Sequence, residues 1–121
     1  MKWEINYKEN DGIIAVKVEG TIDVESEEKL RNEILESIEK YSCRLLLLDL
    51  NKVEIGLSTF EIYDIPRKYM EQSIPRNNKI AVLYAGSESR DLNFYETVTR
   101  NAGYDVMLFS EYDAAMKWLK E

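Results

Sequence analysis

Residues 45–51 read Leu-Leu-Leu-Leu-Asp-Leu-Asn, and residues 57–61 read Leu-Ser-Thr-Phe-Glu. An unbroken apolar run is typical of a β-strand whose sheet is covered on both faces. The second stretch has the composition of a helix start, because Ser58 suits the N-cap position and Glu61, three residues later, completes a capping box. A buried strand that feeds a capped helix predicts an α/β fold with a parallel sheet.

This arrangement puts two hydroxyl groups, those of Ser58 and Thr59, at the carboxyl edge of the sheet. Functional groups of α/β proteins usually lie at that edge. The helical segment 57–73 contains Pro66, which cannot sit in the interior of a straight helix. Two alternatives remain open: the helix kinks near Pro66, or it breaks and restarts with Asp64 as a second cap.

Four further segments have the composition of strands. Lys2–Lys8 and Ile13–Gly20 alternate apolar and polar residues, and an Asp-Gly turn at 11–12 joins them. Alternation around such a turn predicts an antiparallel hairpin. Lys79–Tyr84 and Tyr104–Phe109 are short apolar runs that predict two more strands.

Three other segments repeat apolar residues at helical spacing, and each opens on a residue that can cap a helix. The first is rich in glutamate, and its early glutamates suit the positive end of the helix dipole. The three segments run from Asp23 or Ser26 to Tyr41, from Ser87 or Ser89 to Ala102, and from Ser110 to Leu119.

The predicted order is therefore two strands followed by helix and strand in alternation. This order predicts an α/β fold with a mixed, mostly parallel sheet of about five strands, an antiparallel N-terminal hairpin and four helices. The chain has 121 residues and no dividing linker, so we expect a single domain over residues 1–121.

The composition excludes several kinds of chemistry. Histidine is absent and Cys43 is the only cysteine, which argues against a metal site and against a nucleophile activated by histidine. No nucleophile and base can be paired from the remaining residues, so we expect neither enzymatic activity nor a cofactor.

Charge and hydropathy restrict the partners. The net charge of −7 argues against nucleic acid, and no apolar run is long enough to insert stably into a membrane. The first residues resemble a strand and not a signal peptide. One cysteine and no disulfide suit the reducing cytoplasm.

The pattern resembles a known family. The element order, the strand that ends in Asp49-Leu50-Asn51 and the Ser-Thr pair at the next helix are similar to the STAS domain of anti-sigma-factor antagonists. Within that superfamily the chain resembles most the uncharacterised bacterial SpoIIAA-like, or STAS/SEC14-like, proteins. Segments that carry this resemblance are residues 57–66, Phe94 to Val98, Asn101 to Tyr104 and Val106 to Leu119.

The resemblance implies a candidate phosphorylation site. In phosphorylated antagonists the loop before the second helix typically reads Asp-Ser-(Ser/Thr)-Gly, and a partner kinase phosphorylates the first serine. Ser58 stands at that acceptor position, with Thr59 beside it. Leu57 replaces the aspartate and Phe60 replaces the glycine.

The resemblance implies a non-enzymatic, regulatory protein–protein interaction domain in the bacterial cytoplasm, sensitive to phosphorylation at Ser58 or Thr59. Its partner would be a regulatory protein. The alternative is a small lipid-binding or hydrophobic-ligand-binding protein of SEC14-like type, and edge strands at both ends of the sheet also allow a homodimer. The predicted partner-binding residues are Gly56, Leu57, Ser58, Thr59, Phe60, Tyr63 and Asp64.

These two functions predict different features of the structure. An interaction domain would expose an apolar patch near residues 56–65. A ligand carrier would enclose a cavity on the order of 300 Å³ or more.

Overall fold

The computed structural model describes residues 1–86 and 89–121, and its strands form one sheet in the order β1-β2-β3-β4-β5. β1 and β2 are antiparallel and all other neighbours are parallel, as the sequence predicts. The elements are β1 (Lys2–Lys8), β2 (Ile13–Ile22), α1 (Val24–Tyr41), β3 (Leu45–Ile55), α2 (Thr59–Tyr63), α3 (Ile65–Glu71), β4 (Lys79–Leu83), α4 (Arg90–Asn101), β5 (Asp105–Phe109) and α5 (Tyr112–Leu119).

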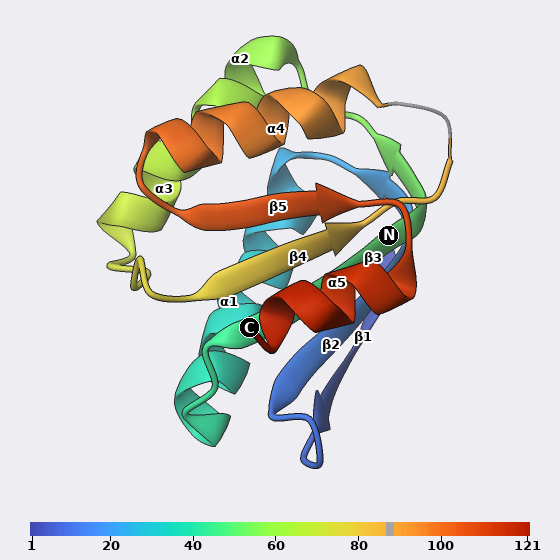
Figure 1. The fold of residues 1–121 in the computed structure, drawn as a ribbon. Coiled ribbons are helices and arrows are strands. Elements are labelled where there is room, and N and C mark those ends of the chain that lie inside the picture. Colours follow the sequence, from blue (N-terminus) through green and yellow to red (C-terminus); the bar gives the residue numbers. More distant parts are fainter. Residues whose placement is uncertain (87–88) are drawn as a thin grey trace.

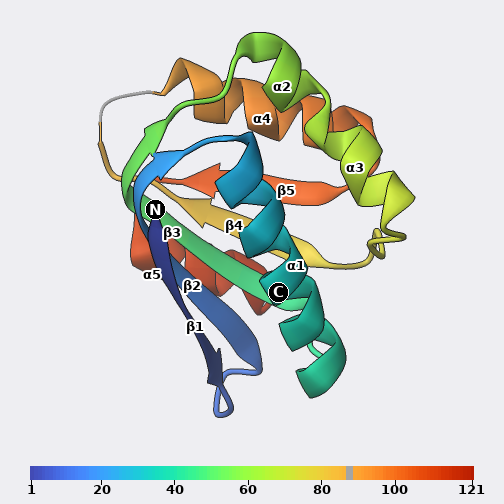
Figure 2. The same cartoon turned by 180° about the vertical axis from the view of Figure 1, so that it is seen from behind.

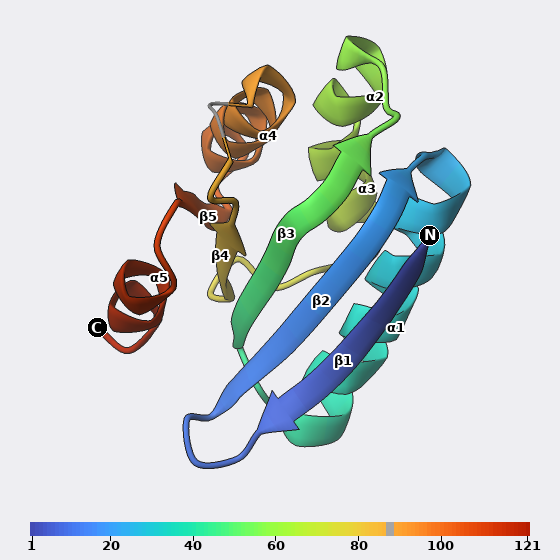
Figure 3. The ribbon, with the colours of Figure 1, turned by 90° about the vertical axis from the view of Figure 1, so that its right-hand side faces the viewer.

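The topology decides which helices cover which face of the sheet. Each parallel connection steps one strand along the sheet in the same direction, so right-handed crossovers put all their helices on one face. α1, the α2–α3 pair and α4 cover that face (Figure 1 and Figure 2). α5 follows the last strand and packs on the opposite face, as the edge-on view in Figure 3 shows.

β3 is the middle strand, and side chains of both its faces are buried. Leu46 and Leu50 belong to the larger core beneath α1 to α4. Leu47 belongs to a smaller core, where it is buried together with Ala115 and Leu119 of α5. The prediction of a leucine-rich strand in the interior is confirmed.

The second predicted helix breaks at Asp64 into α2 and α3. Pro66 occupies the first turn of α3, where a missing N–H removes no helical hydrogen bond. Asp64 stands at the N-cap position, but its side chain makes no capping bond. Its carboxylate instead accepts hydrogen bonds from the guanidinium of Arg67 at 2.6 and 2.7 Å. The structure therefore shows that the helix breaks and restarts at Asp64, rather than kinking near Pro66.

For α1 and α4 the sequence left open which of two residues caps the helix. Asp23 caps α1, and Ser26 completes its capping box from the third helical position. Ser89 caps α4 by accepting a hydrogen bond from the amide of Leu92 at 3.2 Å. Ser87, the other predicted cap of this helix, lies outside the described residues.

The predicted start of the last helix was one residue too early. Glu111, and not Ser110, is the N-cap residue of α5, and its side chain makes no capping bond. The backbone of Glu111 is extended, and its carbonyl accepts the first helical bond from Ala115. α5 therefore begins without a side-chain cap, and its buried residues Ala115 and Leu119 pack on the sheet.

β2 and β3 are longer than the predicted strands. The structure extends β2 to Ile22 and β3 to Ile55, where the sequence predicted ends at Gly20 and Leu50. Beyond Asp49, β3 pairs with β2 and not with β4. The carboxyl end of β3 therefore projects past its β4 neighbour and carries the start of α2 with it.

The two edges of the sheet differ in how they are covered. Glu96 of α4 accepts a hydrogen bond from the amide of Leu108 in β5 at 2.6 Å, and Arg100 donates to the carbonyl of Val106 at 3.0 Å. Side chains of α4 thus form hydrogen bonds with backbone groups of β5 that would otherwise be free to pair with an added strand. A homodimer formed through a sheet edge, which the sequence allows but does not indicate, would therefore pair more readily through β1 than through β5.

We predict that Glu96→Leu exposes the Leu108 amide and lowers the free energy of unfolding by about 1.5–3 kcal/mol, because an ionised acceptor is lost. Urea unfolding and hydrogen exchange at the Leu108 amide measure the two effects. Glu96→Gln keeps an acceptor and is the matched control. Unchanged exchange at Leu108 in Glu96→Leu would show that this bond does not cover the edge.

Candidate functional site

The connection from β3 to α2 is held close to the end of β2. The amide of Gly56 donates to the carbonyl of Ile22 at 2.8 Å. A Cβ atom at Gly56 would lie 2.8 Å from the Thr21 methyl group and 3.0 Å from the Ile22 carbonyl oxygen. A larger residue would therefore push this connection away from β2, so glycine positions the start of α2.

The two candidate phospho-acceptors lie at the start of α2, and both are exposed. Ser58 forms the predicted capping box: its hydroxyl accepts from the Glu61 amide at 3.1 Å, and its own amide donates to the Glu61 carboxylate at 2.8 Å. Thr59 is the first helical residue. Ser58 thus has a structural role whether or not it is modified.

α2 presents two aromatic side chains to solvent. Phe60 is 73% exposed and Tyr63 is 64% exposed, whereas Ile62 between them is only 2% exposed and anchors the helix. Large aromatic side chains dominate the energetics of protein interfaces, so two of them exposed on one short helix make a candidate docking site. This pair forms the centre of what we call the α2 surface: Gly56, Ser58, Thr59, Phe60, Tyr63 and Asp64.

Two residues predicted for partner binding are less available than the rest. Leu57 is half-buried and lines the cavity described below. Asp64 is half-buried as well, and hydrogen bonds from Arg67 lower the pKa of its carboxyl group. Asp64 therefore stays ionised and paired, at the rim of the α2 surface.

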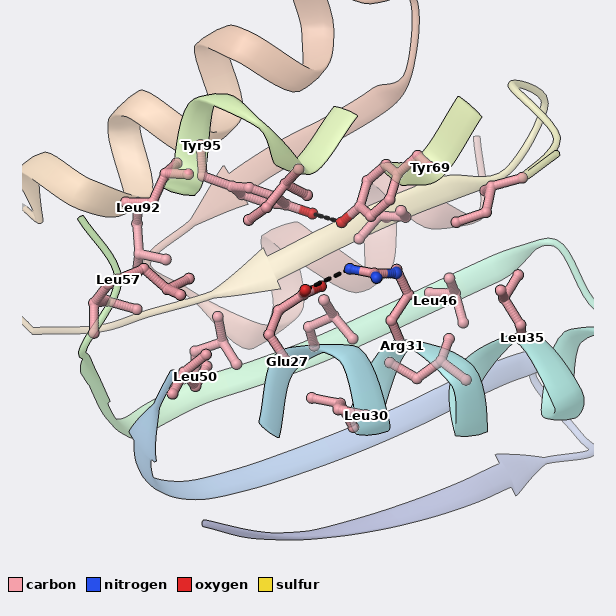
Figure 4. A pocket seen from close by; sticks show the side chains of 18 of the residues that line it. Glu27, Leu30, Arg31, Leu35, Leu46, Leu50, Leu57, Tyr69, Leu92 and Tyr95 are labelled. Atoms are coloured by element: carbon pink, nitrogen blue, oxygen red, sulfur yellow. Dashed lines mark hydrogen bonds and ion pairs between the residues drawn. The ribbon is translucent and has the colours of Figure 1, made fainter. Parts of the chain in front are cut away.

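A cavity of about 120 Å³ lies between α1 and the α2–α4 layer, above the middle of the sheet (Figure 4). Its walls are almost entirely aliphatic, with Leu46 and Leu50 from β3 and Leu30 from α1. The volume is well below the roughly 300 Å³ at which ligand pockets usually begin. It is too small for the chain of a lipid.

Polar side chains line part of this cavity (Figure 4). Arg31 of α1 is buried, forms an ion pair with Glu27 and donates from Nε to the side-chain oxygen of Gln72 at 2.5 Å. On the α3–α4 side, the hydroxyls of Tyr69 and Tyr95 are 2.6 Å apart and hydrogen-bonded. These contacts join α1 to the end of α3, and α3 to α4.

Sequence reasoning missed these residues. The sequence relates the early glutamates of this helix, Glu27 among them, only to the helix dipole, and it does not single out Arg31. A usable signal was present, because Glu27 and Arg31 are four residues apart and flank the apolar position Leu30. Nothing local indicates that the tyrosines of two different helices meet.

Burial shifts the titration of both phenols. It raises the pKa of Tyr95 to about 12 and that of Tyr69 well above its usual range, because the phenolate form would lose its solvation. Both hydroxyls therefore remain protonated and act as hydrogen-bonding groups over the ordinary pH range.

Comparisons with known proteins agree with this fold. Residues 4–59 match the family model of the STAS domain, so the predicted resemblance is confirmed. No curated protein sequence matches the chain. None of the helices in the described residues is long and apolar enough to cross a membrane.

Three solved bacterial structures are similar in fold. An anti-sigma factor antagonist from Mycobacterium paratuberculosis has a TM-score of 0.67 at 19% identity, covering 99% of this chain and 96% of that one. The Bacillus cell fate determinant SpoIIAA in its phosphorylated form has a TM-score of 0.60 at 12% identity, with 97% and 99% covered. An uncharacterised DUF3478 protein with a SpoIIAA-like fold, from Shewanella loihica, has a TM-score of 0.59 at 18% identity, with 98% and 92% covered.

We predict that stability falls as the pH rises from about 10 to 12. Unfolded tyrosine ionises near pH 10, whereas Tyr95 in the folded protein keeps its proton up to about pH 12. The folded state then binds more protons than the unfolded state, so the free energy of unfolding decreases with pH, by roughly 1–3 kcal/mol at pH 12.

Urea unfolding at a series of pH values tests this expectation. Tyr95→Phe should flatten the decrease, and Tyr112→Phe on the exposed face of α5 is the control for losing one tyrosine. An equally steep decrease in Tyr95→Phe would contradict the assignment.

Proposed function

We propose that this STAS-type chain is a regulatory protein–protein interaction domain without chemistry of its own. A STAS-domain match and the fold of anti-sigma-factor antagonists support a regulatory role of this type. We further propose that it works in the bacterial cytoplasm as one domain over residues 1–121. Its partner would be another regulatory protein.

The observation that carries the proposal is the exposure of Phe60 and Tyr63 on one short helix. Their rings would bury a large apolar area against a partner surface, at little cost in side-chain entropy. Buried Ile62 and the capping box of Ser58 hold the helix beneath them. A docking element that is already ordered loses little freedom when it binds.

Phosphorylation at Ser58 or Thr59 is the proposed means of regulation. Both hydroxyls are exposed and lie beside Phe60 in the chain. A phosphate would add nearly two negative charges next to an apolar docking surface and would disfavour a partner that buries the rings. SpoIIAA has a similar fold and has been solved in a phosphorylated form, which makes the start of α2 the natural place to look.

A lipid carrier is the weaker alternative. The cavity of about 120 Å³ offers too little room for an acyl chain, although a smaller ligand would fit in it. We therefore assign partner binding to the α2 surface and treat the cavity separately.

We predict that Phe60→Ala and Tyr63→Ala each weaken partner binding at least tenfold, because aromatic residues at the centre of an interface contribute about 1.4 kcal/mol or more. Affinity purification from the source cell identifies the partner, and titration with the purified partner measures the loss. Tyr112→Ala removes another exposed ring, 44% accessible, from α5 on the opposite face of the sheet and is the matched control. A partner captured equally by all variants would remove the α2 surface from the mechanism.

We predict that Ser58→Ala lowers the free energy of unfolding by about 1 kcal/mol, whereas Ser58→Asp retains the cap and most of the stability. If phosphate regulates binding, Ser58→Asp or Thr59→Asp should bind the partner more weakly than Ser58→Ala. Mass spectrometry of the protein from its source cell tests the modification itself. Unmodified Ser58 and Thr59 in every growth condition would contradict this part of the proposal.

A further inference from the structure

We propose that the cavity between α1 and the α2–α4 layer binds a small uncharged molecule, with an apolar body and one hydrogen-bond acceptor such as a carbonyl oxygen. This ligand site is separate from the α2 surface. It does not depend on the proposed partner binding.

The size of the cavity sets the size of the ligand. Its volume of about 120 Å³ is slightly smaller than the roughly 150 Å³ of an engineered apolar cavity that binds benzene. The aliphatic walls contributed by Leu30, Ile34, Leu46 and Ile80 favour a hydrocarbon body. A single six-membered ring with one substituent matches these limits.

Asn78 supplies the polar recognition. It precedes β4, is only 4% exposed and lines the cavity. Among residues 1–86 and 89–121, its side-chain Nδ2 has no hydrogen-bond partner. A buried donor without a partner costs free energy that a bound acceptor would recover. The unpaired amide therefore points to a ligand that carries an acceptor atom.

The tyrosine pair supplies a second donor in the cavity wall. In the hydrogen bond between Tyr69 and Tyr95, one hydroxyl donates and the other accepts. The accepting hydroxyl still has its own proton to donate. This remaining proton is a second donor that an acceptor atom of the ligand could use.

The charges around the cavity disfavour an anion. Two carboxylates, Glu27 and Asp91, line it together with one guanidinium, Arg31. Arg31 is already paired with Glu27 and lies 3.9 Å from the carboxylate of Glu28. A carboxylate or phosphate ligand would meet excess negative charge, so the acceptor should be uncharged.

Cyclohexanone is the probe, and methylenecyclohexane is its control, because the two have nearly the same shape and only the first has an acceptor oxygen. Titration of the ¹⁵N-labelled full chain, followed by NMR, should give saturable shifts at the backbone amides of cavity residues. The ketone loses more hydration than the alkene when it leaves water, so the hydrogen bond is measured by removing Asn78. We expect that removal to weaken cyclohexanone binding about three- to tenfold, the difference that one hydrogen bond makes.

Two variants test the hydrogen bond from Asn78 and the space in the cavity separately. Asn78→Leu should weaken cyclohexanone binding by this factor and leave methylenecyclohexane binding at least as strong. Ile34→Phe, which fills the cavity from α1, should abolish binding of both probes, and Leu35→Phe serves the same purpose if that variant does not fold. Asn77→Leu changes the exposed neighbouring residue and should behave as the unmodified chain.

Several results would overturn the proposal. One is the absence of saturable shifts, which would mean that water satisfies Asn78. Others are an unchanged cyclohexanone affinity in Asn78→Leu, an equal loss for both probes in that variant, and tighter binding of a long-chain fatty acid than of cyclohexanone. Loss of partner binding in Phe60→Ala would affect none of these readouts, so the two proposals fail independently.

Discussion

The structure depends on the burial of β3 on both of its faces. Successive leucines of this strand face opposite sides of the sheet, so neither side can be left to solvent without a large loss of hydrophobic free energy. Three helical connections cover one side, and α5 alone covers the other. Most of the core consequently lies between the sheet and α1 to α4, and this layer carries both the proposed docking surface and the cavity.

The same strand explains where these two sites lie. Because β3 continues to Ile55 while its β4 partner ends at Leu83, α2 starts beyond the edge of the shared sheet and exposes one side to solvent. α1 contacts the β1–β2 end of the sheet, whereas α4 contacts β5. These helices lie over opposite ends of the sheet, and the cavity occupies the space between them.

Much of the fold could be predicted because its signals are local. The alternation in Lys2–Lys8, the apolar run at 45–50 and the capping box of Ser58 each depend on residues within one short segment. The candidate site was predicted only in part. Phe60 and Leu57 were both predicted as partner-binding residues, but only Phe60 is exposed, because Leu57 turns inward to line the cavity.

Sequence alone determined the strand and helix order, the antiparallel hairpin, and the place of Ser58 and Thr59 at the start of a helix. The spacing of apolar residues and the capping of helix ends depend on residues close together in the chain, so both can be recognised without knowing the fold. Only the tertiary structure decided the break at Asp64, the pairing of Tyr69 with Tyr95 and the burial of Asn78 beside a cavity. These features depend on contacts between residues distant in the chain, whose free energies arise only once the helices have packed on the sheet.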